Sequence, residues 1–214
     1  QLGIDATFHP TDERVILNYC QIDSSKHKTN PIVRECRALT LNKNDYSLIA
    51  RAFPRFFNLN EIPEHKDFDW NECDILTKED GSLILLYWWQ NEWKVQTRAS
   101  LGKGKINNLD KTWEELFLST LPRLPQEKEG YTYIFELCSR YNKVVRDYIH
   151  PTSYLLSFYD GKHELSPQSV DEIAEHYGYY RPMYCHAQNV EDVIKYVATC
   201  GKVDPTFEGV VARS

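Results

Sequence analysis

The sequence has no long apolar run, no paired-cysteine motif and no excess of basic residues. No apolar run approaches the ~18 residues that a membrane-spanning helix needs, so we expect no membrane span. The first residues of the sequence show no secretion-signal pattern. The 25 lysines and arginines are outnumbered by 31 aspartates and glutamates, which gives a formal net charge of −6. Any surface that binds a polyanion must therefore be a local basic patch.

The six cysteines stand apart from one another, at positions 20, 36, 73, 138, 185 and 200. They form no CxxC pair and no metal-ligand spacing, so we interpret them as reduced, mostly buried thiols of an intracellular protein. The hydrophobic fraction of 42% and the charged fraction of 26% are ordinary globular values. A chain of 214 residues fits one large domain or two small ones, with an ample core.

The most informative stretch is residues 73–82, with the sequence CDILTKEDGS. Its apolar start predicts a strand that leads into Lys78, and Asp80-Gly81 predicts a tight turn before a second strand at 83–89. One interpretation is a hairpin whose turn carries a solvated lysine. The other is a nucleophile, because a lysine amine attacks only when unprotonated, which requires desolvation or nearby cations.

Three more charged residues stand in apolar surroundings. Arg37 shares a strand pattern with leucines, Glu136 lies inside the aromatic stretch 131–138, and Glu208 precedes an apolar run. A charge in such a place is costly unless it is paired, bound to a metal or directed at an anion. Structural salt bridges and a ligand site both explain the pattern.

The remaining pattern predicts mostly strands, with three helices. Apolar and alternating runs indicate strands at 14–20, 32–42, 47–53, 83–89, 92–98, 131–138 and 154–159. Helical spacing indicates helices at 109–121, 166–178 and 189–200. Ser166 and Asn189 are typical N-cap residues, and Pro122 stops the first helix. The basic Lys103-Gly104-Lys105 run is either a flexible surface turn or a phosphate-contacting loop.

Four segments, in this order, carry a family resemblance: Arg55-Phe56-Phe57-Asn58-Leu59-Asn60-Glu61, Lys78-Glu79-Asp80-Gly81-Ser82, Phe135-Glu136-Leu137 and Phe207-Glu208-Gly209-Val210-Val211. The second resembles motif I, KxDG, of the covalent nucleotidyltransferases, which are the ATP-dependent ligases and mRNA capping enzymes. Together they resemble the ATP-dependent RNA ligase 1 family, the phage-type ligases of single-stranded RNA, from about Arg34 to Arg213. DNA ligases and capping enzymes usually carry arginine at the position of Leu83.

The resemblance implies an α+β fold, a nucleotidyltransferase domain of antiparallel sheets with flanking helices over residues 1–214. The four segments resemble motifs Ia, I, III and IV in that order, and residues 154–159 resemble motif IIIa. Motif V, a strand with the pattern K-x-K, has no match before Ser214. We expect motif V and a C-terminal domain to belong to a longer chain.

The resemblance also implies the chemistry. Lys78 would attack the α-phosphorus of ATP to form lysyl-AMP, AMP would pass to a 5′-phosphate RNA end, and a 3′-OH would displace it. The residues implied in nucleotide binding are Arg37, Arg55, Thr77, Arg98, Glu136 and Phe158, with Tyr154 as the other residue that could stack on adenine. Glu136 and Glu208 would serve Mg²⁺ or Mn²⁺.

The expected partners are therefore ATP and the ends of single-stranded RNA or tRNA, in RNA repair. We expect a monomer without membrane attachment, in the cytoplasm or inside an infected host cell. A DNA ligase or capping-type enzyme is the near alternative. A non-catalytic RNA-binding protein that kept the fold is the alternative from another class.

Overall fold

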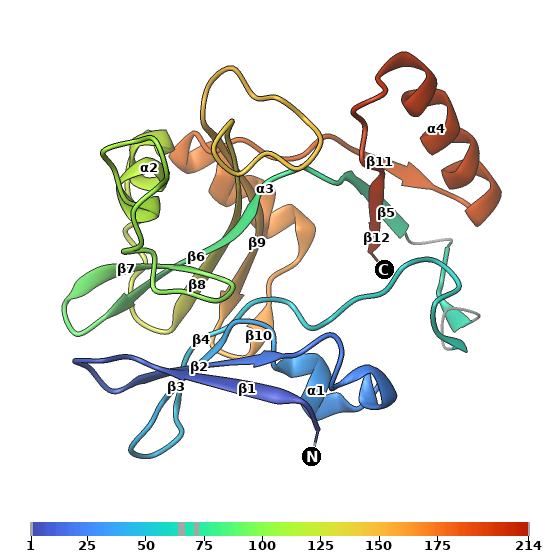
Figure 1. The fold of residues 1–214 in the computed structure, drawn as a ribbon. Coiled ribbons are helices and arrows are strands. Elements are labelled where there is room, and N and C mark those ends of the chain that lie inside the picture. The colour runs from blue at the N-terminus through green and yellow to red at the C-terminus, as the bar shows by residue number, and fades with distance from the viewer. Residues whose placement is uncertain (1, 64–66, 71–72, 214) are drawn as a thin grey trace.

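The computed structural model describes residues 2–63, 67–70 and 73–213, whose strands form three antiparallel sheets (Figure 1). The four-stranded sheet has the order β1-β2-β3-β4, formed by Ile4–Phe8, Arg14–Tyr19, Leu39–Asn42 and Leu48–Ala50. The five-stranded sheet has the order β10-β9-β8-β6-β7, formed by His163–Glu164, Thr152–Asp160, Tyr131–Cys138, Ser82–Trp89 and Glu92–Thr97. The three-stranded sheet has the order β11-β5-β12, formed by Tyr184–Ala187, Cys73–Thr77 and Val210–Arg213. The predicted α+β class is confirmed.

The five-stranded sheet lies between the four-stranded sheet and two helices, α2 (Trp113–Thr120) and α3 (Pro167–Tyr177) (Figure 1). Successive residues of a strand point to opposite faces of its sheet. On β8, Phe135 packs with the residues of α2 and α3, and Ile134 packs toward the four-stranded sheet. Glu136, two residues after Ile134, therefore shares the face that looks toward the four-stranded sheet.

Helix α4 (Val190–Val203) lies beside the three-stranded sheet (Figure 1). Val193 of this helix belongs to one buried cluster with Cys73 and Ile75 of β5 and with Ala187 of β11. This cluster anchors β5, which leads directly to Lys78.

The predicted helix boundaries hold where the cap chemistry is clear. Ser166 and Asn189 are the N-caps of α3 and α4, and each side chain accepts a hydrogen bond from the backbone amide three residues on. Gly178 ends α3 in the left-handed conformation. The helix predicted at 109–121 is shorter, because Thr112 and Glu115 form a capping box that begins α2 at Trp113.

The first half of the strand predicted at 32–42 is wrong. Pro31–Glu35 form a short helix, α1, and β3 begins at Leu39. The Asn30 side chain accepts a hydrogen bond from the Ile32 amide at 3.0 Å, and Pro31 occupies the first turn, where its missing N–H costs nothing. The short helical turn η1 (Ser25–His27) and strands β1, β10 and β11 were not predicted.

The hairpin interpretation of residues 73–89 is also wrong. Strand β5 belongs to the three-stranded sheet and β6 to the five-stranded sheet, so residues 78–81 carry the chain from one sheet to the other. Among the described residues, no helix is long and apolar enough to cross a membrane.

Candidate active site

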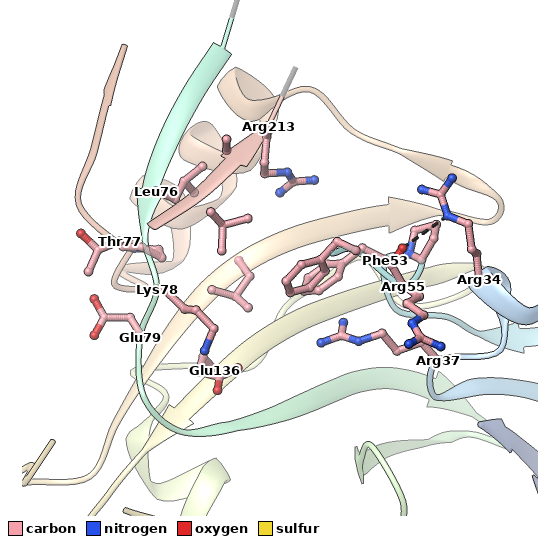
Figure 2. A pocket seen from close by; sticks show the side chains of 16 residues that line it. Arg34, Arg37, Phe53, Arg55, Leu76, Thr77, Lys78, Glu79, Glu136 and Arg213 are labelled. Atoms are coloured by element: carbon pink, nitrogen blue, oxygen red, sulfur yellow. Dashed lines mark hydrogen bonds between the residues drawn. The ribbon is translucent and has the colours of Figure 1, made fainter. Parts of the chain in front are cut away.

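A pocket of about 290 Å³ opens where the end of β5 faces the four-stranded and five-stranded sheets (Figure 2). Its wall is formed by Arg34, Arg37, Phe53, Pro54, Arg55, Phe56, Leu76, Thr77, Lys78, Glu79, Glu136, Leu156, Pro182, Val211, Ala212 and Arg213. Lys78 and Glu136 lie on one side, and Arg34, Arg37 and Arg55 come from the other (Figure 2). A few charged groups around an apolar lining are typical of a small-ligand site.

Lys78 follows the last residue of β5. The backbone there is hydrogen-bonded to the residues that directly precede β12 and β11. The Lys78 backbone amide donates to the Gly209 carbonyl at 2.9 Å, and the Thr77 amide donates to the Met183 carbonyl at 2.8 Å. The Lys78 ammonium forms an ion pair and hydrogen bond with Glu208, just before β12. Figure 2 shows the Lys78 side chain pointing toward Glu136, whereas Thr77 and Glu79 point the opposite way.

Glu136 carries a carboxyl group into this wall from β8. Burial raises its pKa to about 7, against the lowering effects of Lys78 and Arg37, and Glu208 adds a further raising effect. Among the described residues Glu136 forms no ion pair within 4.0 Å. A buried carboxyl group without a paired cation is suited to bind one, since a bound cation would stabilise its ionised form.

Arg37 lies in the bend between α1 and β3, beside Ala38, whose φ is 56°. Its guanidinium carbon stands 4.6 Å from the Phe53 ring centre and 5.1 Å from that of Phe56. The Nη1 atom is buried and has no hydrogen-bond partner among the described residues. Burial lowers the pKa of Arg37, although an arginine stays charged at any working pH. A guanidinium with one buried N–H group left without a partner is suited to receive an anion such as phosphate.

Arg55 and Arg98 meet on one ring, that of Tyr19. Their guanidinium carbons lie 4.4 Å and 4.5 Å from its centre. Arg55 lines the pocket, whereas Arg98 is absent from the pocket wall. Tyr19 is buried at the end of β2, and its sequence context gave no sign of this role.

Asp80 positions the loop that follows β8, a role that the sequence did not reveal. Its carboxylate accepts hydrogen bonds from the Val145 and Arg146 amides, each at 2.6 Å. Ser82 is tied to the same loop, because the Asn142 side-chain amide donates to its hydroxyl at 2.9 Å. Motif I and the 142–146 segment therefore form one hydrogen-bonded unit, with Lys78 at its edge.

The donor set fits a hard divalent cation. Among the described residues no group of three or more His, Cys, Asp or Glu side chains could hold a metal alone. Magnesium needs no such cage, because it is usually bound by one or two carboxylates, waters and substrate phosphate. Glu136 supplies one buried carboxylate, and Glu208 supplies a second that is paired with Lys78.

A family model described as RNA ligase matches residues 35–214. The chain belongs to this RNA ligase family. The match confirms the resemblance drawn from the motif order, and it covers every residue of the site described above except Tyr19 and Arg34.

Two kinds of relative support the assignment. A protein of Autographa californica nuclear polyhedrosis virus, whose name proposes a bifunctional polynucleotide kinase/RNA ligase, is 32% identical over 165 residues. Two structures of an archaeal ATP-dependent RNA ligase, forms 1 and 2, superpose with TM-scores of 0.62 and 0.65 at 14% and 13% identity. At that identity the structures are evidence for a shared fold.

The chain spans only part of the length of these relatives. The alignment with the viral protein covers 67% of this chain and 23% of that protein. The superpositions cover 99% and 98% of this chain and 55% of each archaeal chain. The chain thus spans about half or less of the proteins it matches.

Most of the predicted site residues lie together, and Phe158 is the clear exception. Its side chain is 2% exposed, stacks on Tyr131 at 5.1 Å and belongs to the core beneath α2 and α3. Stacking on a base is therefore excluded for Phe158 in this structure. Tyr154 is absent from the pocket wall too, and Leu156, between them, lies on it.

The cause is a bulge in β9. Ile134 pairs with Ser157 and Phe135 with Leu155, so Leu156 is the extra residue. A bulge reverses the alternation of faces beyond it, and this turns Phe158 toward the helices. The structure adds Arg34, Phe53 and Arg213 to the predicted set. Lys103 and Lys105 are exposed and line neither this pocket nor the one described below.

Proposed function

We propose that this chain is the nucleotidyltransferase domain of an ATP-dependent RNA ligase. The observation that carries the proposal is the convergence of Lys78, Glu136 and Arg37 on one pocket, with Glu208 bonded to Lys78. Arg37, Lys78, Glu136 and Glu208 are at least 41 residues apart along the chain. A solvated surface lysine would need none of these neighbours.

In the first step the Lys78 amine attacks the α-phosphorus of ATP. A phosphorus–nitrogen bond forms, the bond from the α-phosphorus to the bridging oxygen breaks, and pyrophosphate leaves. The Lys78 ion pair with Glu208 must open and the amine must lose a proton before it attacks. Arg37 and Arg55 neutralise the phosphate charge that builds up in the transition state.

Glu136 and Glu208 would hold a Mg²⁺ or Mn²⁺ ion, which when bound supplies charge neutralisation to the phosphates. The apolar part of the wall, including Leu76 and Leu156, would contact the adenosine. Thr77 would contribute through its main chain, because its side chain points away from Lys78 (Figure 2).

In the later steps AMP passes from Lys78 to the 5′-phosphate of an RNA strand, and a 3′-OH displaces AMP to seal the strand. We propose single-stranded RNA ends, such as those of a cleaved tRNA, as the substrate. The proposal includes a monomer that works in the cytoplasm, in RNA repair. The viral relative, whose name pairs kinase and ligase, supports a repair role, since a kinase can supply a 5′-phosphate.

The test uses a single-stranded RNA with a labelled 5′-phosphate and a free 3′-OH, incubated with the protein, ATP and Mg²⁺. We expect adenylylated RNA and then a circular or joined product on a denaturing gel. A matched strand with a 5′-OH should give neither. Unchanged RNA in the presence of folded protein would contradict ligation, and equal sealing of a DNA strand would favour a DNA ligase.

A further inference from the structure

A second pocket, of about 470 Å³, adjoins the first. Its wall is formed by Tyr19, Gln21, Ser25, Lys28, Arg55, Phe56, Phe57, Asn58 and Glu61. Arg55 and Phe56 belong to both walls, so a ligand in the second pocket would lie directly beside a ligand in the first. Lys78 and both carboxylates of the proposed metal site are absent from the second wall.

Cations gather around the Phe57 ring at one side of the second pocket. The Lys28 ammonium nitrogen lies 5.9 Å from the ring centre, and the guanidinium carbons of Arg34 and Arg55 lie at 5.8 Å and 5.3 Å. Glu61 fixes the position of Lys28 through an ion pair at 3.3 Å. The Glu61 carboxylate also accepts a hydrogen bond from the Asn58 backbone amide at 3.0 Å. This hydrogen bond lowers the pKa of Glu61 more than Lys28 does.

This combination has a specific ligand chemistry. Aromatic rings stack on nucleobases of any sequence, and lysine and arginine bind the phosphates between them. The whole chain has a formal net charge of −6, so a polyanion needs a local basic patch. Lys28 and Arg55 line the second pocket and outnumber its one acid, Glu61, and Arg34 of the first pocket's wall adds a third cation beside Phe57.

We propose that the second pocket binds the 5′-terminal nucleotide of the RNA strand, with its base against Phe57 and its phosphate beside Lys28 and Arg55. The proposal deepens the ligase function and rests on it for the identity of the ligand. The shared wall would bring the 5′-phosphate next to the AMP carried by Lys78, which is the group that this phosphate must attack.

The phosphate chemistry alone would also suit the β- and γ-phosphates of ATP. The aromatic wall favours the RNA strand, because a triphosphate tail offers no base to stack. The two possible ligands, ATP and RNA, predict that variants of the pocket fail in different steps. ATP is used in lysyl-AMP formation, and RNA is used only afterwards.

The experiment compares Phe57→Leu, which removes the aromatic face but keeps apolar volume, with Lys28→Gln, which removes one charge. Phe8→Leu and Lys195→Gln are the matched controls, because Phe8 is 62% exposed on β1 and the Lys195 side chain is 77% exposed on α4. Two quantities are measured for each protein. One is the rate of labelling by α-labelled ATP, and the other is the RNA concentration that half-saturates AMP transfer from purified, pre-adenylylated protein.

We expect labelling by ATP within about twofold of the unmodified protein, and a half-saturating RNA concentration raised about tenfold in both variants. An RNA that lacks its first base should bind the unmodified protein about tenfold more weakly. It should bind Phe57→Leu no more weakly than the intact RNA does, because the contact is already lost.

Slower ATP labelling with normal RNA use would assign the pocket to the ATP phosphates and overturn the proposal. Unchanged values in both assays would show that the pocket binds neither. If the unmodified protein fails to label with ATP, the ligase function fails by itself. Anisotropy of a fluorescent 5′-phosphorylated RNA hexamer then tests the pocket directly, and equal binding by Phe57→Leu, Lys28→Gln and the controls would overturn it.

Discussion

Glu136 and Glu208 both interact with Lys78, but their surroundings differ. Glu136 is buried on β8, where burial raises its pKa to about 7. Glu208 lies before β12, with its side chain 30% exposed and bonded to the Lys78 ammonium. The two acids should therefore respond differently to pH and to substitution.

Glu136 should make the unliganded protein lose stability as pH rises. Its folded pKa of about 7 lies above the ordinary value of 4.5, so the stabilising contribution is complete below pH 4.5 and is lost as pH rises through 7. At 1.36 kcal/mol per pKa unit, the difference amounts to at most about 3 kcal/mol. Urea unfolding of the protein and of Glu136→Gln between pH 4.5 and 8 measures it. Parallel pH profiles for the two proteins would contradict the raised pKa.

Glu208→Gln should fold normally and yet fail in the first chemical step. Removing one preorganised charged group from such a site costs on the order of a hundredfold in rate. The variant should also need more Mg²⁺ or Mn²⁺ for half-maximal labelling by ATP. Thermal melting without ligand checks the fold, and Glu129→Gln, on an exposed loop residue, is the matched control. Normal labelling at the same metal concentration would leave Glu208 as a structural acid.

At the scale of elements, Gly81 fixes how closely β6 approaches β8. A Cβ atom at this position would lie 2.3 Å from the Leu137 carbonyl oxygen, a contact that backbone must move to relieve. This explains the glycine of the Lys78–Ser82 motif by close approach, since no positive φ is involved.

Gly81→Ala should therefore destabilise the fold by about 1–3 kcal/mol, as forced overpacking does. Gly201→Ala is the matched control, because a Cβ there meets nothing and the residue lies within α4. That change should stabilise by about 0.5–1 kcal/mol through helix propensity. Denaturant unfolding of both variants measures the contrast, and a Gly81→Ala protein of normal stability would show that the strands can separate without cost.

Element boundaries could be predicted from the sequence where one residue decides them locally. Ser166, Gly178 and Asn189 act through their own caps, and each prediction held. The strand predicted at 32–42 begins too early, because an Asn-Pro pair such as Asn30-Pro31 is compatible with a loop but here caps and begins a helix. The face of Phe158 could not be predicted, because the bulge at Leu156 depends on pairing with β8.

At the scale of the whole molecule, a buried polar network joins the four-stranded sheet to the five-stranded sheet. Arg14 of β2 donates to the Tyr87 hydroxyl at 2.9 Å, and that hydroxyl donates to the Gln96 side-chain oxygen at 2.9 Å. The Thr40 hydroxyl of β3 donates to the same oxygen at 2.8 Å. Arg14, Thr40, Tyr87 and Gln96 are each at most 2% exposed. The network fixes one sheet against the other, and the first pocket opens at their common edge.

Tyr87→Phe should weaken this junction, because it removes the hydroxyl to which the buried Arg14 donates and one of the two donors to the Gln96 oxygen. We expect a loss of about 1–3 kcal/mol in the free energy of unfolding. Tyr46→Phe, at a residue that is 73% exposed, should change it by less than about 0.5 kcal/mol. Equal unfolding midpoints for the two variants would show that the network is not needed.

The chemistry of the site could be predicted from the sequence more fully than its shape. Lys78, Glu136 and Arg55 could be identified because each lies in a short motif that a single sequence displays. Tyr19, Phe53 and Arg213 line or support the pocket only because three sheets meet there, and no local pattern marks them. The second pocket was missed for the same reason, because η1, its neighbour Lys28 and the loop from Arg55 to Glu61 come together only in the fold.

Nucleotide choice is a property of the whole pocket. Because the chain belongs to the RNA ligase family, we expect ATP to label the protein and GTP not to. Parallel labelling with α-labelled ATP and GTP at equal concentration measures the preference. Preferential labelling by GTP would instead support a capping-type enzyme.

The most direct test of the proposed ligase function is covalent labelling of Lys78. The protein is incubated with α-labelled ATP and Mg²⁺, resolved on a denaturing gel and mapped by peptide mass spectrometry. We expect an acid-labile AMP adduct on the peptide that contains Lys78, lost in Lys78→Ala and kept in Lys195→Ala, whose side chain is exposed on α4. Label that persists in Lys78→Ala at the same level, or an unmodified protein that takes up none, would contradict the assignment of Lys78 as the nucleophile.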